Sequence, residues 1–395
     1  MASIHSYISV VNLDKFTRFI FIFLFFAIIS VPGLVDIFNI QPTVEPIVEN
    51  RTLAPLPNFS GIGDISKTID QSMKWFDDHF GLRSLLIRVK NQIDFSVFSI
   101  SNRVHIGKGG WLFYRSVIDK YEQKIEAMSD ADMDNAVQLI AKLRDYLTAR
   151  SIELVVITIQ MNYRFYPEYL PASAQFAIKQ HRFDDFKAKL SALPGITYMD
   201  TTPLLFQTKE KRPIFHKTNF HWNDPAAFEV AKVLVDHLAD GNNDPSLRWR
   251  LPLDIEKKPL FGGVARFMPL LFPYQEEEAL FIAPIPPDQT TPLMYERNVG
   301  PFEVVSHASQ YSKKLLPPAV VLGDSFMDGV DRCGLPHHFE SEYRAVIYHA
   351  PMNDILRAMP SDTRYFVFEF IEVALPNLNS ILSFDPKVVE EKPKS

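Results

Sequence analysis

The sequence predicts an α/β fold, a three-layer α/β/α sandwich built around a mainly parallel sheet. Three observations support this prediction. Helix-like and strand-like segments alternate along most of the chain, which is typical of parallel sheets with helical crossovers. The strand-like segments are largely continuous apolar runs, as expected where both faces of a sheet are covered. The 395 residues, 47% apolar and 22% charged, are enough for one large core with accessory segments.

Each expected element follows from a local pattern. Apolar residues at steps of three and four predict helices, and short apolar, β-branched runs predict buried strands. In chain order, the expected elements are a helix over 130–149, a strand over 152–159, a helix over 183–190, a strand over 197–200, a helix over 225–238, and strands over 319–322, 345–349 and 365–370. The helix over 225–238 has the clearest start, because Asn223 suits an N-cap and Pro225 suits a first helical turn.

The chain divides into four expected parts. Residues 1–40 are a cytoplasmic stub and a transmembrane signal anchor, and residues 41–105 are an extended, proline-spaced linker followed by a helical lead-in. Residues 106–384 form the main domain, in which the proline-rich stretch 240–306 predicts an insertion or a second small sheet. Residues 385–395, rich in Lys, Glu and Pro, predict a disordered tail.

The uncharged apolar segment over residues 19–35 predicts a membrane-spanning helix, since about 17 residues is the short end of what crosses a bilayer. Lys15 and Arg18 precede this segment and Asp36 follows it, which by the positive-inside rule leaves the N-terminus in the cytoplasm and the main domain outside. A cleaved signal peptide is the alternative. No small-x-small cleavage site follows the apolar core, so we expect an uncleaved anchor.

Charge and cysteine content exclude several classes of protein. A net charge of -6, with no run of Lys and Arg, argues against binding nucleic acid. The single cysteine, Cys333, excludes an intramolecular disulfide framework and a multi-cysteine zinc site. His337 and His338 are adjacent rather than spaced as metal ligands, so we expect neither a metal nor a cofactor.

A candidate nucleophile follows the predicted strand over 319–322. The sequence there is Gly323-Asp324-Ser325-Phe326, and ligands bind at the carboxyl ends of strands in an open α/β sheet. Gly323 suits a tight bend, Asp324 suits a brace for the turn, and backbone N–H groups near Ser325 suit an oxyanion hole. The alternative is an ordinary helix N-cap, because Asp and Ser both cap well.

A candidate base for Ser325 lies upstream. His221 occupies the loop before the helix over 225–238, and Asn219 lies two residues earlier on the same side of an extended segment. Asn219 is therefore expected to orient the imidazole, which would activate the serine hydroxyl. The alternative is a histidine with a purely structural role.

Other side chains are candidates for binding a substrate, although each has a structural alternative. They are Trp222, Tyr348 and Arg164, together with Trp111, His349 and Asn353. Glu369 is a charge inside an apolar strand, so we expect it to have an ion-pair or hydrogen-bond partner.

These motifs resemble the SGNH-hydrolase-like domain of alginate O-acetyltransferases of the AlgJ/AlgX type. In that family an Asp-x-His-Trp motif precedes a Gly-Asp-Ser nucleophile. The similar segments here are Gly109-Gly-Trp-Leu-Phe113, Tyr166-Pro-Glu-Tyr-Leu-Pro171, His221-Trp222 and Gly323-Asp-Ser-Phe326, and a membrane anchor precedes them. The resemblance covers roughly residues 60–380.

The resemblance implies an SGNH-hydrolase-like fold and an acetyl transfer outside the cytoplasm. Ser325 would become acetylated after His221 takes its proton, and a hydroxyl of an exopolysaccharide would receive the acetyl group. The acetyl donor would be a polytopic membrane acyltransferase. The protein would be a single-pass protein of the inner membrane whose catalytic domain faces the periplasm.

Two departures from the family pattern leave other functions open. Asn219 replaces the usual aspartate, and Gln160-Met161-Asn162 replaces a Pro-x-Lys. Asparagine can orient a histidine but cannot stabilise an imidazolium by charge, and Asp200 and Asp224 are spare acids. The alternatives are a carbohydrate acetylesterase that uses the same residues, or a catalytically weak polysaccharide-binding or assembly subunit.

Overall fold

The computed structural model of the protein describes residues 2–38, 40, 47, 52–57, 64–179, 182–309 and 314–390. The chain forms two compact units, one of Met1–Ser99 with Pro269–Pro273 and one of Ile100–Met268 with Tyr274–Ser395. Most of the extended linker predicted between residues 41 and 59 lies outside the described residues.

The first unit is helical. It contains α1 (Ala2–Ile37), α2 (Ile65–His79), α3 (Arg83–Ile93) and a short π-helix (Asp94–Phe98). Within α1, the 21-residue segment Lys15–Val35 contains an 18-residue window with a mean hydropathy of 2.4, which makes this helix long and apolar enough to cross a membrane.

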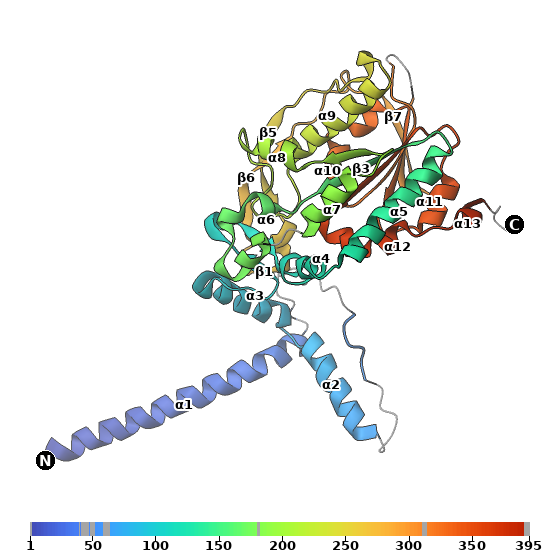
Figure 1. Ribbon diagram of the computed structural model, residues 1–395. Coiled ribbons are helices and arrows are strands. Elements are labelled where there is room, and N and C mark those ends of the chain that lie inside the picture. The colour runs from blue at the N-terminus through green and yellow to red at the C-terminus, as the bar shows by residue number, and fades with distance from the viewer. Residues whose placement is uncertain are drawn as a thin grey trace. The chain divides into compact units, whose positions relative to one another are not determined.

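The second unit is built on a seven-stranded sheet with the order β4-β3-β11-β9-β10-β8-β7 (Figure 1). In this order, each neighbouring pair from β4 to β10 is parallel. The pairs β10-β8 and β8-β7 are antiparallel. The seven strands are β3 (Glu153–Ile159), β4 (Thr197–Asp200), β7 (Leu293–Val299), β8 (Phe302–Ala308), β9 (Ala319–Gly323), β10 (Ser341–Val346) and β11 (Tyr365–Ile371). Two further pairs form separate small sheets, β1 (Val104–Ile106) with β2 (Leu112–Tyr114) and β5 (Ile255–Phe261) with β6 (Gln275–Ile282).

Helices follow most of the parallel strands. They are α4 (Gln123–Glu126), α5 (Asp130–Thr148), α6 (Asn162–Phe165), α7 (Arg182–Ser191), α8 (Thr202–Lys209), α9 (Asp224–Gly241), α10 (Met327–Arg332), α11 (Met352–Ala358), α12 (Leu378–Leu382) and α13 (Pro386–Glu390). As the sequence predicts, Asn223 caps α9, because its side chain accepts a hydrogen bond from the Ala226 N–H at 3.1 Å.

The sheet separates two hydrophobic cores. Alternate residues of β3 point to opposite faces, so Val155 and Ile157 belong to one core, and Leu154 and Val156 belong to the other. The first core is shared with α9 and the second with α5 and α11, which cover opposite faces of the sheet in Figure 1. The predicted three-layer α/β/α sandwich with a mainly parallel sheet is therefore confirmed.

One strand was predicted with the wrong bounds. The strand expected over 345–349 is β10, Ser341–Val346, and the backbone turns away at Tyr348, whose φ is 71°. Two side chains inside β10, those of Glu342 and Arg344, are charged but buried. Charged residues interrupt an apolar run, so a search for such runs starts the strand too late.

Two further expectations need correction. The stretch 240–306 is not wholly an insertion, because β5 and β6 form the second small sheet but β7 and β8 extend the main sheet. The tail predicted to be disordered from residue 385 instead begins with α13, where Val389 is buried against the second core. Burial of this apolar side chain offsets the polar composition of the tail, and residues 391–395 lie outside the described part.

Candidate active site

Ser325 lies in the turn between β9 and α10, at the edge where the parallel strands β9, β10 and β11 all end. Ser325 is exposed to solvent. The Asp324 carboxylate braces this turn, because Oδ1 accepts the Phe326 N–H at 2.8 Å and Oδ2 accepts the Ile371 N–H at 3.0 Å. The strand end and the brace together present the serine hydroxyl at the surface.

Two buried side chains hold the same turn from below. Arg344 donates to the carbonyl oxygens of Gly323 at 3.2 Å and Asp324 at 2.8 Å. Glu369, fully buried, accepts the Asp324 N–H at 3.0 Å, which is the kind of partner expected for a charge within an apolar strand. A Cβ on Gly323 would lie only 2.6 Å from Oε2 of Glu369, so the turn requires glycine for close packing.

Burial also raises the pKa values of the two carboxyl groups that support the turn. It raises the pKa of Asp324 to about 6, while the backbone N–H groups that this carboxylate accepts act in the opposite direction. Burial raises the pKa of Glu369 well above its usual range, with the charge of Asp324 adding to the rise and Arg344 opposing it. The turn therefore rests on carboxyl groups whose protonated forms are favoured by desolvation.

The loop that carries His221 is closed by an isolated β-bridge between Phe215 and Trp222. The Trp222 ring packs against Phe326 with ring centroids 5.3 Å apart, and its Nε1–H donates to the Phe326 carbonyl oxygen at 3.0 Å. One tryptophan thus ties the histidine loop to the serine turn.

The structure brings Ser325, His221 and Asn219 into a single chain of contacts. His221 Nε2 lies 2.7 Å from Ser325 Oγ, and His221 Nδ1 lies 2.9 Å from Asn219 Oδ1. Asn219 Oδ1 also accepts the backbone N–H of His221 at 3.2 Å, which identifies that amide atom as the oxygen. The oxygen can only accept, so Nδ1 carries the proton and the lone pair of Nε2 faces the serine hydroxyl.

The imidazole is held in its neutral form. The pKa of His221 is lowered to about 4, mainly by burial and then by the positive charges of Arg332 and Arg266. A neutral imidazole at 2.7 Å is within reach of the serine proton and can accept it. The geometry is that of a nucleophile, a general base and an orienting group.

Neither spare acid contacts the imidazole. Asp224 forms an ion pair with Arg332 at 2.9 Å, and Asp200 accepts the Thr202 N–H at 3.0 Å and pairs with Lys187 at 3.2 Å. Asn219 is therefore the residue that orients His221 in this structure.

One backbone N–H remains available for an oxyanion. The Asp324 amide donates to Glu369, and the Phe326 amide donates to the Asp324 side chain. Among the described residues, the Ser325 amide makes no hydrogen bond. Gly323 and Asp324 thus support the turn, and the Ser325 N–H is the candidate donor.

The predicted substrate-binding roles of two residues were wrong. Trp222 is only 3% exposed and its indole is used inside the core. Arg164 is buried against Glu122 and lies 3.5 Å from Glu372. The polar groups of both side chains therefore already serve the fold.

The remaining candidates divide by exposure. Tyr348 is 60% exposed and stays a prediction, whereas Trp111 is only 3% exposed. His349 pairs with Glu303, and the Asn353 side chain accepts the Asp385 N–H at 2.9 Å. These two polar side chains therefore already have partners in the fold.

One segment that packs against the site was not predicted from the sequence. The 3₁₀ helix Gly263–Phe267 packs on the histidine loop, where the Val264 N–H donates to the Thr218 carbonyl oxygen at 2.7 Å. A Cβ on Gly263 would lie 2.9 Å from Cβ of Asn219. The pair Gly262-Gly263 inside a proline-rich stretch is a signal of close backbone approach that could have located this contact.

Among the residues that the structure describes, no group of three or more His, Cys, Asp or Glu side chains is arranged to hold a metal ion. Cys333 is a free, buried thiol, and burial raises its pKa. The candidate nucleophile of the site is therefore the serine rather than the cysteine.

Comparison with known proteins confirms the family resemblance. Residues 104–249 match a family model described as an SGNH hydrolase-like domain, acetyltransferase AlgX. Two curated relatives carry the name probable alginate O-acetylase AlgJ. The one from Pseudomonas syringae pv. tomato is 23% identical over 378 residues, which cover 86% of this chain and 88% of the relative. The one from Pseudomonas putida is 24% identical over 340 residues, which cover 80% and 82%.

The solved structure of Bacillus cereus PatB1 has the same fold. Bacillus cereus PatB1 aligns with a TM-score of 0.50 and 13% identity, covering 70% of this chain and 98% of that chain. The O-acetyltransferase domain of Pseudomonas putida AlgJ aligns with a TM-score of 0.44 and 19% identity, covering 72% and 96%. The family model and the PatB1 alignment together give the second unit an SGNH-hydrolase-like α/β fold.

Proposed function

Since the chain carries an SGNH hydrolase-like domain of the AlgJ/AlgX type, we propose that it is a membrane-anchored, extracytoplasmic O-acetyltransferase that acetylates an alginate-like exopolysaccharide. The observation that carries this proposal is the contact chain from Asn219 through His221 to Ser325. The names of the AlgJ relatives support both the acetyl transfer and the polysaccharide.

In the first half-reaction, Ser325 Oγ attacks the acetyl carbonyl carbon of the donor while His221 Nε2 takes the hydroxyl proton. The carbonyl oxygen becomes an oxyanion, which the Ser325 N–H is free to bind. When the bond to the donor oxygen breaks, His221 returns the proton to that oxygen. The products are acetyl-Ser325 and a donor with a free hydroxyl.

In the second half-reaction, a hydroxyl oxygen of the acceptor sugar attacks the acetyl carbon of acetyl-Ser325. His221 Nε2 takes the proton of the sugar hydroxyl and then gives it to Ser325 Oγ as the ester bond breaks. Asn219 keeps the same imidazole tautomer throughout, because its Oδ1 faces Nδ1. The enzyme returns to its starting state with the acetyl group on the sugar.

The N-terminal helix supports the proposed location. Residues 19–35 of this helix would cross the inner membrane once and hold the catalytic unit on the periplasmic side, in the orientation that Lys15 and Arg18 before them favour. A polytopic membrane acyltransferase would supply acetyl groups from the cytoplasmic side of the same membrane.

The test is whether Ser325 becomes acetylated. The full chain in detergent is mixed with 4-nitrophenyl acetate, quenched in acid, digested and analysed by mass spectrometry. We expect one acetyl group on the peptide that contains Ser325, and none in Ser325→Ala. Ser383→Ala is the control, because Ser383 is an exposed serine elsewhere in the same unit and should leave acetylation unchanged.

The products separate the proposal from its alternatives. With oligomannuronate present, a transferase yields acetylated oligosaccharide, whereas an acetylesterase yields only free acetate. A folded wild-type protein that neither acquires an acetyl group nor releases 4-nitrophenol would instead be a binding or assembly subunit, and the proposal would be rejected.

A further inference from the structure

Two exposed arginines lie near Ser325 and His221 and have no part in the proposed proton transfers. Arg332 ends α10, the helix that follows the serine turn. Arg266 belongs to the 3₁₀ helix Gly263–Phe267, which packs on the histidine loop. Burial and then the charges of these two arginines lower the pKa of His221, so both guanidinium groups act on its imidazole. The base of the site therefore lies in a positive field.

Arg332 is fixed in place but open to solvent. Its Nη2–H donates to Oδ1 of Asp224 at 2.9 Å. Asp224 is only 4% exposed, and its Oδ2 accepts the Ile282 N–H at 3.2 Å. The Arg332 side chain nevertheless remains 59% exposed, and its other N–H groups make no hydrogen bond among the described residues. A guanidinium that is already held in position loses little freedom when it binds a carboxylate.

Arg266 has no ion pair among the described residues and is connected to the site by a row of aromatic rings. Its guanidinium lies 5.4 Å from the centroid of the Phe267 ring. Phe267 stacks on Tyr114 with ring centroids 4.4 Å apart, and Tyr114 stacks on Phe220 at 6.2 Å. The Phe220 ring lies 4.2 Å from the ring of His221. These contacts connect Arg266 to the loop that carries the base.

The arginines outnumber the acids beside the imidazole. Asp224 is already paired with Arg332, and Arg266 has no acid as a partner in the described part of the chain. The two acids within α10 both pair with Arg344, at 3.5 and 3.2 Å. Asn219 orients the imidazole without adding a negative charge. The positive charge that remains would attract an anion to this place.

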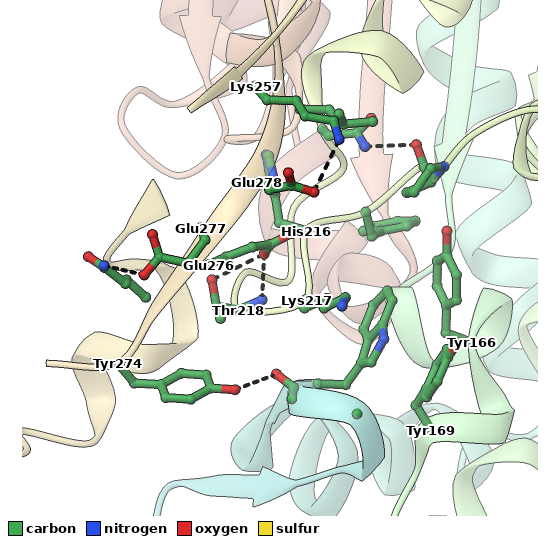
Figure 2. Close-up of a pocket in the computed structure, with 18 residues that line it drawn as sticks. Tyr166, Tyr169, His216, Lys217, Thr218, Lys257, Tyr274, Glu276, Glu277 and Glu278 are labelled. Carbon is green, nitrogen blue, oxygen red and sulfur yellow. Dashed lines mark hydrogen bonds and ion pairs between the residues drawn. The ribbon is translucent and has the colours of Figure 1, made fainter. Parts of the chain in front are cut away.

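A cavity of about 680 Å³ adjoins Arg332 and gives an anionic chain room to extend. Its two acids, Asp224 and Glu256, are paired with Arg332 and Lys258. A second cavity, of about 550 Å³, is lined instead by three consecutive glutamates, 276–278, and by two lysines (Figure 2). The excess of negative charge would repel an anionic chain there, so we expect such a chain to follow the cavity beside Arg332.

We propose that Arg332 and Arg266 bind the carboxylate of the acceptor uronate whose hydroxyl receives the acetyl group. A guanidinium matches a carboxylate in a two-pronged hydrogen bond. Each ring of a polyuronate carries its carboxylate and its hydroxyls together, so holding the carboxylate positions a hydroxyl of that ring near acetyl-Ser325. Water lacks a carboxylate, so the same contact would favour transfer to the sugar over hydrolysis. The role in transfer rests on the proposed function, whereas the binding can be measured without it.

The test compares two probes that differ only in charge. The full chain carrying Ser325→Ala, in detergent, is titrated with β-1,4-linked hexamannuronate and with β-1,4-linked mannohexaose, and binding is followed by calorimetry. The rings and linkages match, but only the first probe bears carboxylates. We expect hexamannuronate to bind about tenfold more tightly, equivalent to about 1.4 kcal/mol.

Three variants locate the binding. Arg266→Gln removes a charge without breaking an ion pair among the described residues, so hexamannuronate should bind several-fold more weakly. Arg332→Lys keeps a positive charge beside the buried Asp224 but loses the two-pronged fork, and it should also weaken hexamannuronate. Arg297→Gln is the control, because Arg297 is an exposed arginine of β7 that lacks an ion pair in the described part of the chain. It should leave both affinities unchanged.

A second readout tests whether the arginines position the acceptor. With Ser325 intact, the ratio of acetylated oligomannuronate to free acetate should fall several-fold in Arg266→Gln, because hydrolysis by water needs no carboxylate contact. Arg297→Gln should keep the ratio of the wild type. An arginine that only stabilised the fold would not change this ratio.

The outcomes distinguish the carboxylate site from the proposed function. The site would be overturned if hexamannuronate bound no more tightly than mannohexaose, or if its affinity were unchanged in both Arg266→Gln and Arg332→Lys, even with Ser325 acetylated. Binding that prefers hexamannuronate and depends on the two arginines would support the site, even if Ser325 never became acetylated. Melting temperatures show which variants are folded, and Arg266→Gln decides if Arg332→Lys is not.

Discussion

Asn219 holds His221 at two points, because its Oδ1 accepts hydrogen bonds from both the ring Nδ1 and the backbone N–H of the histidine, at 2.9 and 3.2 Å. The double contact fixes the loop and the ring together. It provides orientation without negative charge, and burial and the neighbouring Arg332 lower the pKa of His221 to about 4. The site therefore keeps a neutral base over a wide pH range but lacks a counter-charge for the imidazolium.

Changing Asn219→Asp should alter the pH dependence of 4-nitrophenol release from 4-nitrophenyl acetate. A carboxylate beside Nδ1 raises the pKa of His221, by about 1 to 3 units for a close opposite charge. The base works only when neutral, so the acid limb of the kcat/KM profile should move to higher pH. Above that limb the rate should rise by about tenfold, because the charge stabilises the imidazolium in the transition state.

Asn298→Asp is the control for that experiment. Asn298 lies in β7, distant from the serine along the sheet, and its change adds the same charge. Asn298→Asp should show the same dependence of kcat/KM on pH as the wild type. An acid limb that stays near pH 4 in Asn219→Asp would mean that residue 219 does not set the protonation of His221.

Gly263→Ala should reduce activity more than its effect on stability explains. The new Cβ would meet the Thr218 carbonyl oxygen at 2.6 Å and Cβ of Asn219 at 2.9 Å, so the orienting residue must shift. Gly300→Ala is a matched control, since its φ of +60° equals the +59° of Gly263 within a degree but its Cβ would meet no atom within 4 Å. Both variants should lose about 1 to 2 kcal/mol of unfolding free energy from the left-handed backbone.

Only the Gly263 variant should release 4-nitrophenol more slowly, by about tenfold or more, because a small misplacement of catalytic groups lowers the rate steeply. Urea denaturation and initial rates measured on the same preparations give both quantities. Equal activity losses in the two glycine variants would show that backbone strain, and not the contact with Asn219, is responsible.

Trp222→Phe tests the tie between the two halves of the site. The change removes the Nε1–H donor to the Phe326 carbonyl oxygen and keeps an aromatic ring beside Phe326. Trp249→Phe removes a bond of the same kind, from Nε1 to the Leu251 carbonyl oxygen at 2.9 Å, away from the serine turn. Each variant should lose about 1 kcal/mol of unfolding free energy.

We expect kcat for 4-nitrophenyl acetate to fall about tenfold in Trp222→Phe with little change in KM, because the histidine loop loses its bond to the serine turn. Trp249→Phe should retain its kcat. If both tryptophan variants kept full kcat, the Trp222 bond would be part of the general fold and not of the site.

The sequence could predict the parallel strands because their buried residues are apolar on both faces, as in β3 and β11. It failed at β10, where Glu342 and Arg344 are buried charges, since a buried charge depends on partners from other segments, as Arg344 does on Asp331 of α10 at 3.2 Å. The antiparallel β7 is also hard to identify, because its side chains are mostly exposed and give no apolar run.

The candidate site follows a similar division. Asn219 and His221 are neighbours in sequence, and Ser325 follows a recognisable strand, so local patterns suffice to pick them out. Gly263 and Arg344 act through contacts between segments that are distant in sequence. The Gly262-Gly263 pair signals a close backbone approach without naming its partner, and no local pattern marks Arg344. Trp222 was assigned to the ligand because an aromatic residue beside a candidate base gives no indication of which way it points.

A buried cluster beside β11 should make stability depend on pH. The Tyr163 hydroxyl contacts Oε2 of Glu122 and lies 2.9 Å from Oε1 of Glu372. One phenol proton faces two carboxyl groups, so a proton on one of these groups removes the repulsion between them. The pKa of Glu122 is raised to about 8, mainly by burial and then by Glu372, while Arg164 opposes the rise.

Because the folded-state pKa of Glu122 lies above its ordinary value of 4.5, its contribution to stability is complete below about pH 4.5 and is lost as the pH rises to about 8. The unfolding free energy of the full chain in detergent, measured by urea titration, should therefore fall between pH 5 and pH 9. Glu122→Gln keeps a neutral, hydrogen-bonding side chain at every pH and should flatten this decline, whereas the exposed Glu210→Gln should not. An equally steep decline in Glu122→Gln would show that Glu122 is already ionised in the folded protein at pH 5, and that Arg164 outweighs the cost of burial.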